Sequence, residues 1–318
     1  MPPHAKAVLV VGEALIDSVS AGQGETLEHV GGSPANVAVG LGALGHQVEL
    51  ATWFGPDERG QRIVAHCAHA GVRITPGSDG AARTSLAQAT LDRFGQATYR
   101  FELTWSVPPV RDLTAFGHVH TGSIAATIEP GATEVLATLA ALRPTATVSY
   151  DPNVRPTLMP SADEVRPRIE ALVALADVVK ASDEDLQWLY PGAFIPDVIR
   201  AWEALGPALV VITRGAEGAM YAVRSGGASK VTTVPPRRVD VTDTVGAGDS
   251  FMAGLLSGLA DLDYLGGPAA RARLATAGID ELRPAVDRAV ASAAATVARA
   301  GAFAPTRTEL DTVTSQAR

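Results

Sequence analysis

The sequence contains few lysines and a single cysteine, and each shortage excludes a type of site. Lysine occurs three times in 318 residues, at Lys6, Lys180 and Lys230. A Walker-type phosphate loop is excluded, because its glycines must lead into Gly-Lys-Ser or Gly-Lys-Thr. The lone Cys67 excludes an internal disulfide and a four-cysteine zinc site. If the protein handles phosphate, it does so with backbone amides, arginine or a metal ion.

The chain also lacks an excess of basic residues and any long hydrophobic run. A net charge of -8 argues against a nucleic-acid-binding surface, which needs a basic patch. The apolar stretch 251–259 is too short to span a bilayer, which takes about 20 residues. A strand-like segment from Ala7 stands where a signal peptide would be, so we expect a cytoplasmic protein. The hydrophobic content of 47% is typical of a globular protein with a substantial core.

Short apolar segments alternate with amphipathic segments of helical length. The predicted strands are 8–11, 48–52, 119–121, 147–150, 178–180 and 209–213. The predicted helices are 35–44, 60–70, 133–142, 162–175, 183–189, 196–205 and 284–299. This alternation is typical of a parallel sheet with helices on both faces. Ligands bind such sheets at the carboxyl ends of the strands, so the polar residues there are the candidates.

Two segments depart from this alternation, residues 13–30 and residues 84–104. Neither shows helical periodicity, and the second alternates as strand, turn and strand around Phe94 and Gly95. We expect both to form β-structure that makes a small flap over the site.

The run Asp-Thr-Val-Gly-Ala-Gly-Asp at 243–249 leads directly into an apolar segment with helical spacing. Gly246, Ala247 and Gly248 therefore lie at a predicted helix N-terminus, where free amides and the helix dipole attract an anion. A carboxylate at that position, Asp249, would repel a phosphate. It is suited to take a proton from a hydroxyl that attacks the bound phosphoryl group. The alternative is a tight turn capped by Asp249.

Polar residues near the N-terminus could hold a polyol. Asp17 follows the first strand and can accept hydrogen bonds from neighbouring hydroxyls, although a surface loop is the alternative. Gly31 and Gly32 permit close backbone approach. Asn36, in the first turn of the next helix, offers an amide to a sugar hydroxyl. The alternative there is ordinary capping, with Ser33 as the N-cap.

Three later strands also end in polar residues. Asp-Pro-Asn-Val-Arg-Pro at 151–156 directs the carboxylate of Asp151, the amide of Asn153 and the guanidinium of Arg155 at one crevice, unless it is only a proline-flanked turn. Ser182 and Asp185 either cap a helix or hold a hydrated Mg²⁺ through water. The turn at 213–218 is a candidate purine or phosphate contact, formed by Thr213, Gly215 and Gly218.

The order of these motifs resembles that of the ribokinase-like (PfkB) carbohydrate kinases over nearly the whole chain. Gly-Gly-Ser-Pro-Ala-Asn-Val-Ala at 31–38 is similar to the family's N-terminal motif, and 243–249 to its C-terminal motif. Gly-Glu-x-Leu-Ile-Asp at 12–17, with 31–36 and 151–156, is most similar to fructokinases. The resemblance implies a three-layer αβα, Rossmann-like domain spanning residues 1–318. Its β-sheet lid would come from insertions at roughly 13–31 and 84–107, and such lids often join two subunits into a homodimer.

The resemblance also implies roles for particular residues. Asp249 would be the general base, and residues 246–248 the anion hole. The implied substrate-binding residues are Asp17, Gly32, Asn36, Asn153 and Arg155, and the implied nucleotide-binding residues are Thr213, Gly215 and Gly218. Asp185 would hold Mg²⁺ in its outer shell, where Ser182 and Asp185 replace the family's Asn and Glu. A monovalent cation such as K⁺ would lie near Asp243 and the Val245 carbonyl.

These expectations describe an ATP-dependent sugar kinase that uses Mg²⁺ and phosphorylates a hydroxymethyl group, with fructose the favoured acceptor. The alternatives within the class are 2-keto-3-deoxygluconate, ribose or a nucleoside as acceptor. An alternative from another class is a non-catalytic sugar- or nucleotide-binding regulator on the same fold. The partners expected are small molecules, with neither nucleic acid nor membrane.

Overall fold

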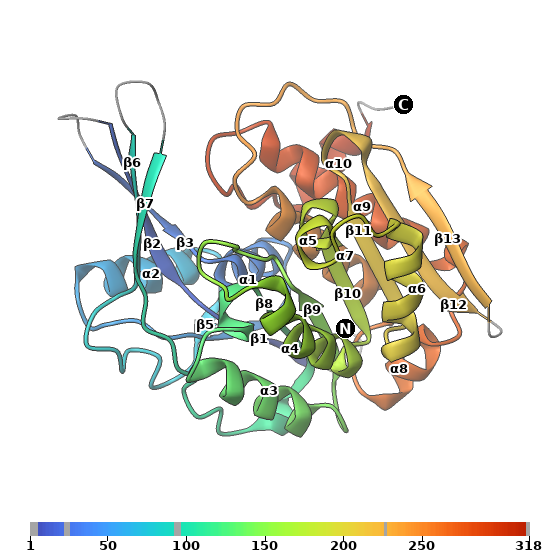
Figure 1. The fold of residues 1–318 in the computed structure, drawn as a ribbon, viewed down its shortest axis with the longest axis horizontal. Helices are drawn as coiled ribbons and strands as arrows, with labels where there is room; N and C mark the ends of the chain where they lie inside the picture. The colour runs from blue at the N-terminus through green and yellow to red at the C-terminus, as the bar shows by residue number, and fades with distance from the viewer. Residues whose placement is uncertain (1–5, 22–25, 92–96, 226–227, 316–318) are drawn as a thin grey trace.

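The protein is an α/β structure with one large sheet between two layers of helices (Figure 1). The computed structural model describes residues 6–21, 26–91, 97–225 and 228–315. The large sheet has the strand order β13-β12-β11-β10-β9-β8-β1-β4-β5. Its strands are β1 (Ala7–Val11), β4 (Val48–Ala51), β5 (Arg73–Ile74), β8 (Phe116–Gly122), β9 (Thr147–Asp151), β10 (Val178–Ser182), β11 (Leu209–Thr213), β12 (Ala219–Ser225) and β13 (Ala228–Val234). All six predicted strands are among them.

The strands from β11 to β5 run parallel, as predicted, but the opposite edge of the sheet does not. β12 pairs antiparallel with both β11 and β13, so the sheet is mixed. A short turn between antiparallel strands needs no crossover helix. The alternation of strands and helices in the sequence therefore gave no sign of this hairpin.

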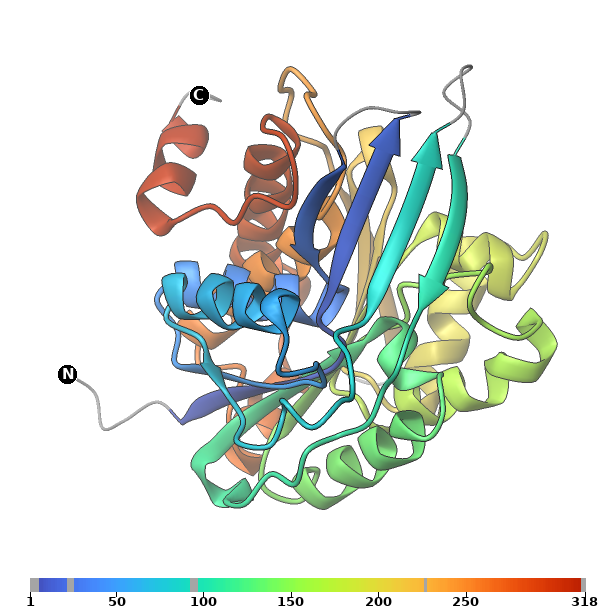
Figure 2. The same ribbon diagram turned by 90° about the vertical axis from the view of Figure 1, so that its left-hand side faces the viewer.

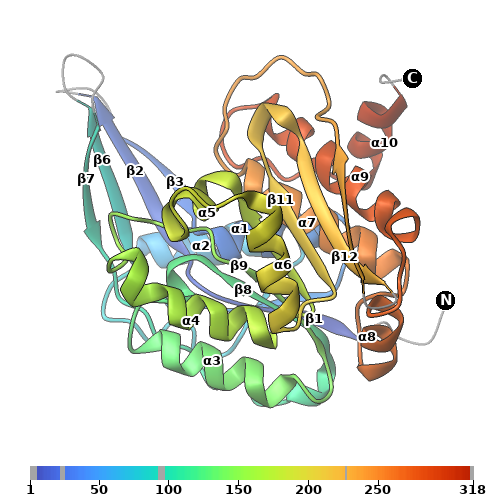
Figure 3. The ribbon, with the colours of Figure 1, turned by 45° about the vertical axis from the view of Figure 1, so that its right-hand side comes forward.

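Helices cover both faces of the sheet, which confirms the predicted three-layer αβα fold (Figure 3). One face packs against α1 (Ser33–Ala43), α2 (Glu58–His69), α7 (Ala247–Asp261) and α9 (Ile279–Val297). The other packs against α3 (Gly131–Leu142), α4 (Ala162–Leu175), α5 (Asp183–Leu189) and α6 (Ile195–Leu205). α8 (Pro268–Leu274) and α10 (Arg307–Ser315) complete the set of α-helices in the described residues. No helix in that part of the chain is long and apolar enough to cross a membrane.

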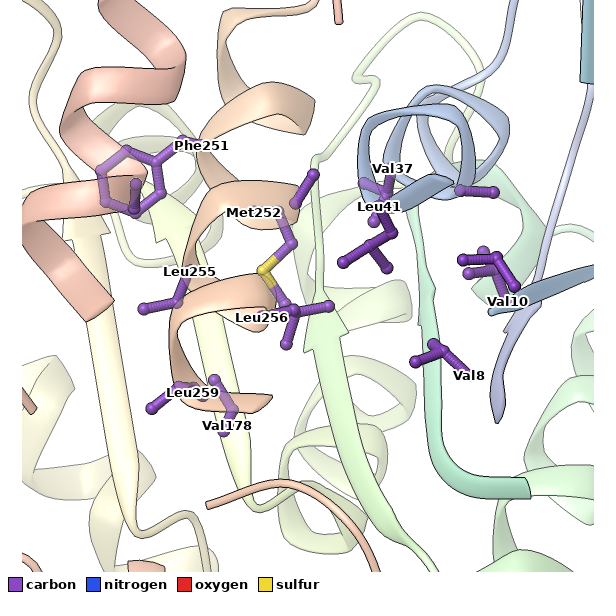
Figure 4. Close-up of a cluster of buried hydrophobic side chains, with 14 of the residues drawn as sticks. Val8, Val10, Val37, Leu41, Val178, Phe251, Met252, Leu255, Leu256 and Leu259 are labelled. Carbon is purple, nitrogen blue, oxygen red and sulfur yellow. The ribbon is translucent and has the colours of Figure 1, made fainter. Parts of the chain in front are cut away.

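α7 lies between α1 and α9 in the helix layer that covers one face of the sheet. Its apolar residues at helical spacing, Phe251, Leu255 and Leu259, are buried as the sequence pattern predicted (Figure 4). Glycines allow the neighbouring helices to approach closely. A Cβ placed on Gly258 would lie 2.6 Å from the Cα of Ala285 in α9. α7 is therefore fixed tightly in the core.

A second, four-stranded sheet stands beside the first, with the order β3-β2-β6-β7 (Figure 2). It consists of β2 (Leu15–Ala21), β3 (Leu27–Gly31), β6 (Leu86–Leu91) and β7 (Ala97–Glu102). These strands fall within the two segments for which β-structure was predicted. The turn expected around Phe94 and Gly95 lies outside the described residues.

Candidate active site

Most of the candidate residues gather at the carboxyl ends of the parallel strands of the large sheet. β1, β9, β10 and β11 belong to its parallel part, so the segments that follow these strands emerge on the same side. These segments include residues 12–17, 152–155, 183–185 and 214–218. The N-termini of α1 and α7 supply the remaining candidates. This edge is where open α/β sheets bind their ligands.

The predicted helix after the glycine run begins at Ala247, with Gly246 as its N-cap. Gly246 has a φ of 75°, and a Cβ there would lie 2.6 Å from the Cβ of Ala302, so the turn requires glycine. The Ala247 amide donates to the carbonyl of Thr244 at 3.2 Å. The Ala247 amide, one of the three in the predicted anion site, is thus engaged within the turn itself.

Asp249 is buried in the first turn of α7 and is bound by two donors from α1. The Ser33 hydroxyl donates to Oδ1 at 2.6 Å, and the Asn36 amide donates to Oδ2 at 2.8 Å. Both oxygens of Asp249 act as acceptors in these bonds. Two motifs more than 200 residues apart thus meet at its side chain.

Ser33 has a different place from the one that the capping interpretation gave it. The N-cap of α1 is Gly32, no side chain caps the helix, and the Ser33 hydroxyl is directed to Asp249 instead. Gly32 has a φ of 103°, and a Cβ there would lie 2.5 Å from the carbonyl oxygen of Glu13. Gly32 is therefore needed for close packing of the chain on itself.

Asp17, on β2, lies near Asp249 and near two cationic side chains. Burial raises the pKa of Asp17, the charges of Arg155 and His29 lower it, and Asp249 raises it further. Gly31 makes room for this carboxylate, since a Cβ there would lie 2.0 Å from Asp17 Oδ2. His29, paired with Asp17 across β2 and β3, was not identified from the sequence.

Asn153 and Arg155 form a compact turn after β9. Asn153 has a positive φ of 37°. Arg155 is exposed, and it donates to the Asn153 side chain at 2.6 Å and to the Asn153 carbonyl at 3.2 Å. Its charge also acts on Glu13 and Asp17. The guanidinium is therefore the cation that balances the carboxylates at this end of the site.

Asp185 caps α5 in the structure. Its Oδ2 accepts from the Ser182 amide at 2.7 Å and its Oδ1 from the Val154 amide at 2.8 Å, while the Ser182 hydroxyl completes the capping box. Each oxygen of Asp185 thus accepts one hydrogen bond from the backbone. Among the described residues, no three His, Cys, Asp or Glu side chains are grouped so that they could hold a metal ion.

The loop before α7 docks on the segment that follows α9. Asp243 accepts from the amides of Val245 at 3.0 Å and Gly301 at 2.8 Å. The Thr242 amide donates to the carbonyl of Val297 at 2.7 Å. These bonds fix the backbone around the Val245 carbonyl, the position implied for a monovalent cation.

Thr213, Gly215 and Gly218 lie at the carboxyl end of β11, in and around the 3-10 turn η3 (Gly215–Glu217). Thr213 and Gly218 are half-buried and Gly215 is exposed. Gly218 has a φ of 84°, and a Cβ there would lie 2.1 Å from the carbonyl oxygen of Val234. The turn therefore lies against the start of the connection from β13 to α7.

Two further buried charged groups at this edge were not assigned a role from the sequence. Lys180 on β10 forms an ion pair with Asp151 on β9, with 2.9 Å between Nζ and Oδ2. Lys180 could have been singled out from the sequence, because it is one of three lysines in the chain and lies in a predicted apolar strand. Glu13, after β1, accepts from the Ala125 amide at 3.1 Å, and burial raises its pKa to about 7.

Comparison with known proteins places the chain in a family. The pfkB family carbohydrate kinase profile matches residues 5–309. The chain is 34% identical over 262 residues to a fructokinase from Klebsiella pneumoniae, covering 80% of this chain and 84% of that protein. The structure of a fructokinase from Xylella fastidiosa with bound ATP aligns with a TM-score of 0.81 at 27% identity, covering 98% and 99% of the two chains. A fructokinase from Vibrio cholerae O395 with fructose, ADP and calcium ion aligns with a TM-score of 0.77 at 27% identity, covering 97% and 98%. The chain therefore belongs to the pfkB family of carbohydrate kinases.

Proposed function

We propose that the protein is an ATP-dependent fructokinase in which Asp249 is the general base. The observation that carries this proposal is the buried Asp249 carboxylate in the first turn of α7, bound by Ser33 and Asn36 of the N-terminal motif. The similarity to fructokinases at about a third identity over four fifths of the chain supports fructose as the acceptor.

In this mechanism Asp249 takes the proton of a hydroxymethyl group of the sugar. The hydroxyl oxygen forms a bond to the γ-phosphorus of ATP, and the bond from that phosphorus to the leaving ADP oxygen breaks. Ser33 and Asn36 hold the carboxylate in position, so that the base is oriented before the sugar binds. Asp17 would accept hydrogen bonds from other hydroxyls of the sugar, and the Asn153 amide would donate to them. Gly32 and Arg155 would lie at the same end of the site.

The first turn of α7 would offset the negative charge of the transferred group. The amides of Gly246 and Gly248 and the positive end of the helix dipole would act on this group, while the Ala247 amide holds the turn in shape through the Thr244 carbonyl. Thr213, Gly215 and Gly218 would contact the nucleotide. Mg²⁺ supplies charge neutralisation on the phosphates, and we assign Asp185 to its water shell. K⁺ near Asp243 and the Val245 carbonyl would support the same turn.

The small sheet would serve as the lid of this site and as a dimer interface. Val19 and Leu27 oppose each other across β2 and β3, and they are 38% and 57% exposed. Apolar side chains exposed together on a sheet are suited to contact with a second copy. Light scattering on the purified protein tests this, since a monomer at micromolar concentration would contradict it. A cytoplasmic location stays a prediction.

The proposed function is tested by ADP release from Mg-ATP with fructose, ribose, 2-keto-3-deoxygluconate or adenosine as acceptor. We expect turnover with fructose, and a loss of at least ~10³-fold in kcat for Asp249→Asn, the upper part of the range for general-base catalysis. Asp240→Asn, at an exposed position before the motif, is the matched control and should retain full activity. Preference for another acceptor would overturn fructose, and an Asp249→Asn enzyme that keeps a tenth of the rate would overturn the base.

A further inference from the structure

A buried ion pair lies directly beneath the first turn of α7. The Nζ of Lys180 is 2.9 Å from Oδ2 of Asp151, and the two side chains are 3% and 0% exposed. A Cβ placed on Gly248 would lie 3.1 Å from the same Nζ. The ammonium group therefore lies against the backbone of the turn that is proposed to bind the transferred phosphoryl group.

Three carboxylates, those of Asp151, Asp185 and Asp249, act on this one ammonium group. Burial lowers the pKa of Lys180, but Asp151, Asp185 and Asp249 together raise it by more, so the group is a cation near neutral pH. The second oxygen of Asp151, Oδ1, is buried and has no hydrogen-bond partner among the described residues. A buried pair of this kind is weak evidence for stability, because desolvation offsets the attraction between the charges.

A chain of neutral hydrogen-bonding groups runs along the same face of the sheet toward Lys180. His120 Nδ1 lies 2.9 Å from the Ser149 hydroxyl, which lies 2.8 Å from His118 Nε2, and His118 Nδ1 lies 2.8 Å from the Thr147 hydroxyl. Burial lowers the pKa of both histidines to about 3, so both rings are neutral at physiological pH.

The far end of this chain is anchored on the backbone. The Thr147 hydroxyl accepts from the Gly266 amide at 3.0 Å and lies 3.4 Å from the carbonyl oxygen of Gly117. At the near end, His120 Nε2 is buried and has no hydrogen-bond partner among the described residues. The positive charge of Lys180 acts on this ring.

We propose that Lys180 is a further residue of the phosphoryl-transfer site, a fixed cation held under Gly248 by Asp151. It would act through the turn, by offsetting the charge that the γ-phosphoryl group of ATP brings to the N-terminus of α7. This proposal rests on the proposed function. It makes Lys180 a positioning residue, because its contacts are with the protein and not with the acceptor.

A purely structural role, in which the pair only joins β9 to β10, predicts different behaviour. Removal of one partner strands the other charge in the core and destabilises the fold under either reading. Removal of both, in Lys180→Met with Asp151→Asn, leaves no stranded charge. Under the structural reading this double variant recovers both fold and function. Under our proposal it recovers the fold alone.

The experiment compares the double variant with wild type by chemical unfolding, by calorimetric Kd values for ADP, ATP and fructose with Mg²⁺ present, and by turnover. We expect an unfolding midpoint near that of wild type and Kd values for ADP and fructose within about threefold. ATP should bind at least ~10-fold more weakly, and kcat should fall by ~10²-fold, the effect of losing one preorganised group at such a site. Lys230→Met, on exposed β13, is the control and should change none of these values.

A folded double variant that keeps the wild-type ratio of ATP to ADP affinity would overturn the proposal. If the double variant does not fold, Lys180→Arg keeps the charge and Lys180→Gln removes it while still offering a donor to Asp151. The ratio of ATP affinity to ADP affinity should then stay near the wild-type value in Lys180→Arg and fall in Lys180→Gln. Equal ratios in the two variants would refute our assignment. If the wild-type protein binds ATP but does not phosphorylate fructose, the proposed acceptor is wrong. The proposal for Lys180 is still tested in that case, because it depends on the ratio of the ATP and ADP affinities and not on fructose turnover.

Discussion

Glu13 should give the fold a pH dependence that a single substitution removes. Its carboxyl group is buried between the large sheet and the small one, where it accepts from the Ala125 amide. Burial raises its pKa from 4.5 to about 7. The two values differ by about 2.5, and one pKa unit corresponds to about 1.4 kcal/mol, so ionising Glu13 in the folded protein costs about 3 kcal/mol.

The sign follows from the higher pKa in the folded state. The folded protein holds the proton more tightly than the unfolded chain, so this stabilisation is fully present below pH 4.5 and is lost as the pH rises through 7. Glu13→Gln keeps an oxygen to accept from Ala125 and carries no ionisable group. The free energy of unfolding of the variant minus that of wild type should therefore rise by about 3 kcal/mol between pH 4.5 and pH 8.

Urea denaturation at several pH values measures this difference directly. Other groups titrate in the same range, but they are common to both proteins and cancel in the subtraction. Glu58→Gln, at an exposed position in the first turn of α2, is the control and should give a difference that does not change with pH. If the Glu13→Gln difference is also constant from pH 4.5 to 8, then Glu13 is not the buried acid that the structure describes.

Three further changes have defined outcomes. Ser33→Ala removes one of two donors to the Asp249 carboxylate, and we expect kcat to fall by about tenfold and denaturation to show a loss of about 1.5–3 kcal/mol, the size of one hydrogen bond to a charged group; an unchanged kcat would contradict a positioning role. Gly40→Val would press on Ala253, since a Cβ there lies 2.6 Å from the Ala253 Cβ, and denaturation should show a loss of about 1–3 kcal/mol from overpacking. His118 and His120, whose pKa values burial lowers from 6.5 to about 3, stabilise the fold above pH 6.5 and lose that contribution as the pH falls toward 3. Replacing His120 by Gln should flatten this acid limb in urea titrations, and an unchanged slope would argue that His120 is not buried as a neutral ring.

The sequence was informative where local pattern and tertiary structure agree. The helix that follows the glycine run was predictable, because Gly246 needs a positive φ and the apolar residues after it recur at helical spacing. The gathering of polar residues at one sheet edge followed from the parallel strand order. The hairpin of β12 and β13 was missed, because its strands join without the helix that marks a parallel crossover.

Contacts between distant segments could not be read from the sequence. Ser33 looked like an N-cap, a role that depends on nearest neighbours, yet its hydroxyl is bound to a carboxylate 216 positions away. Lys180 was counted as one of three lysines, and nothing local shows that its ammonium meets Asp151. In both cases the partner is set by how helices and strands pack, which periodicity does not encode.

The position of the base depends on the packing of α7 as much as on the motif that carries it. α7 meets α9 at Gly258 and α1 at the Gly40–Ala253 contact, and in both places a larger side chain would separate the helices. Asn36 lies about one turn before Gly40 on α1, and it reaches Asp249 at 2.8 Å because the two helices are this close. A shift of about 1 Å between α1 and α7 would break that bond without altering any residue of either motif. The glycines inside these helices therefore constrain the position of Asp249 as directly as those in the turn before α7.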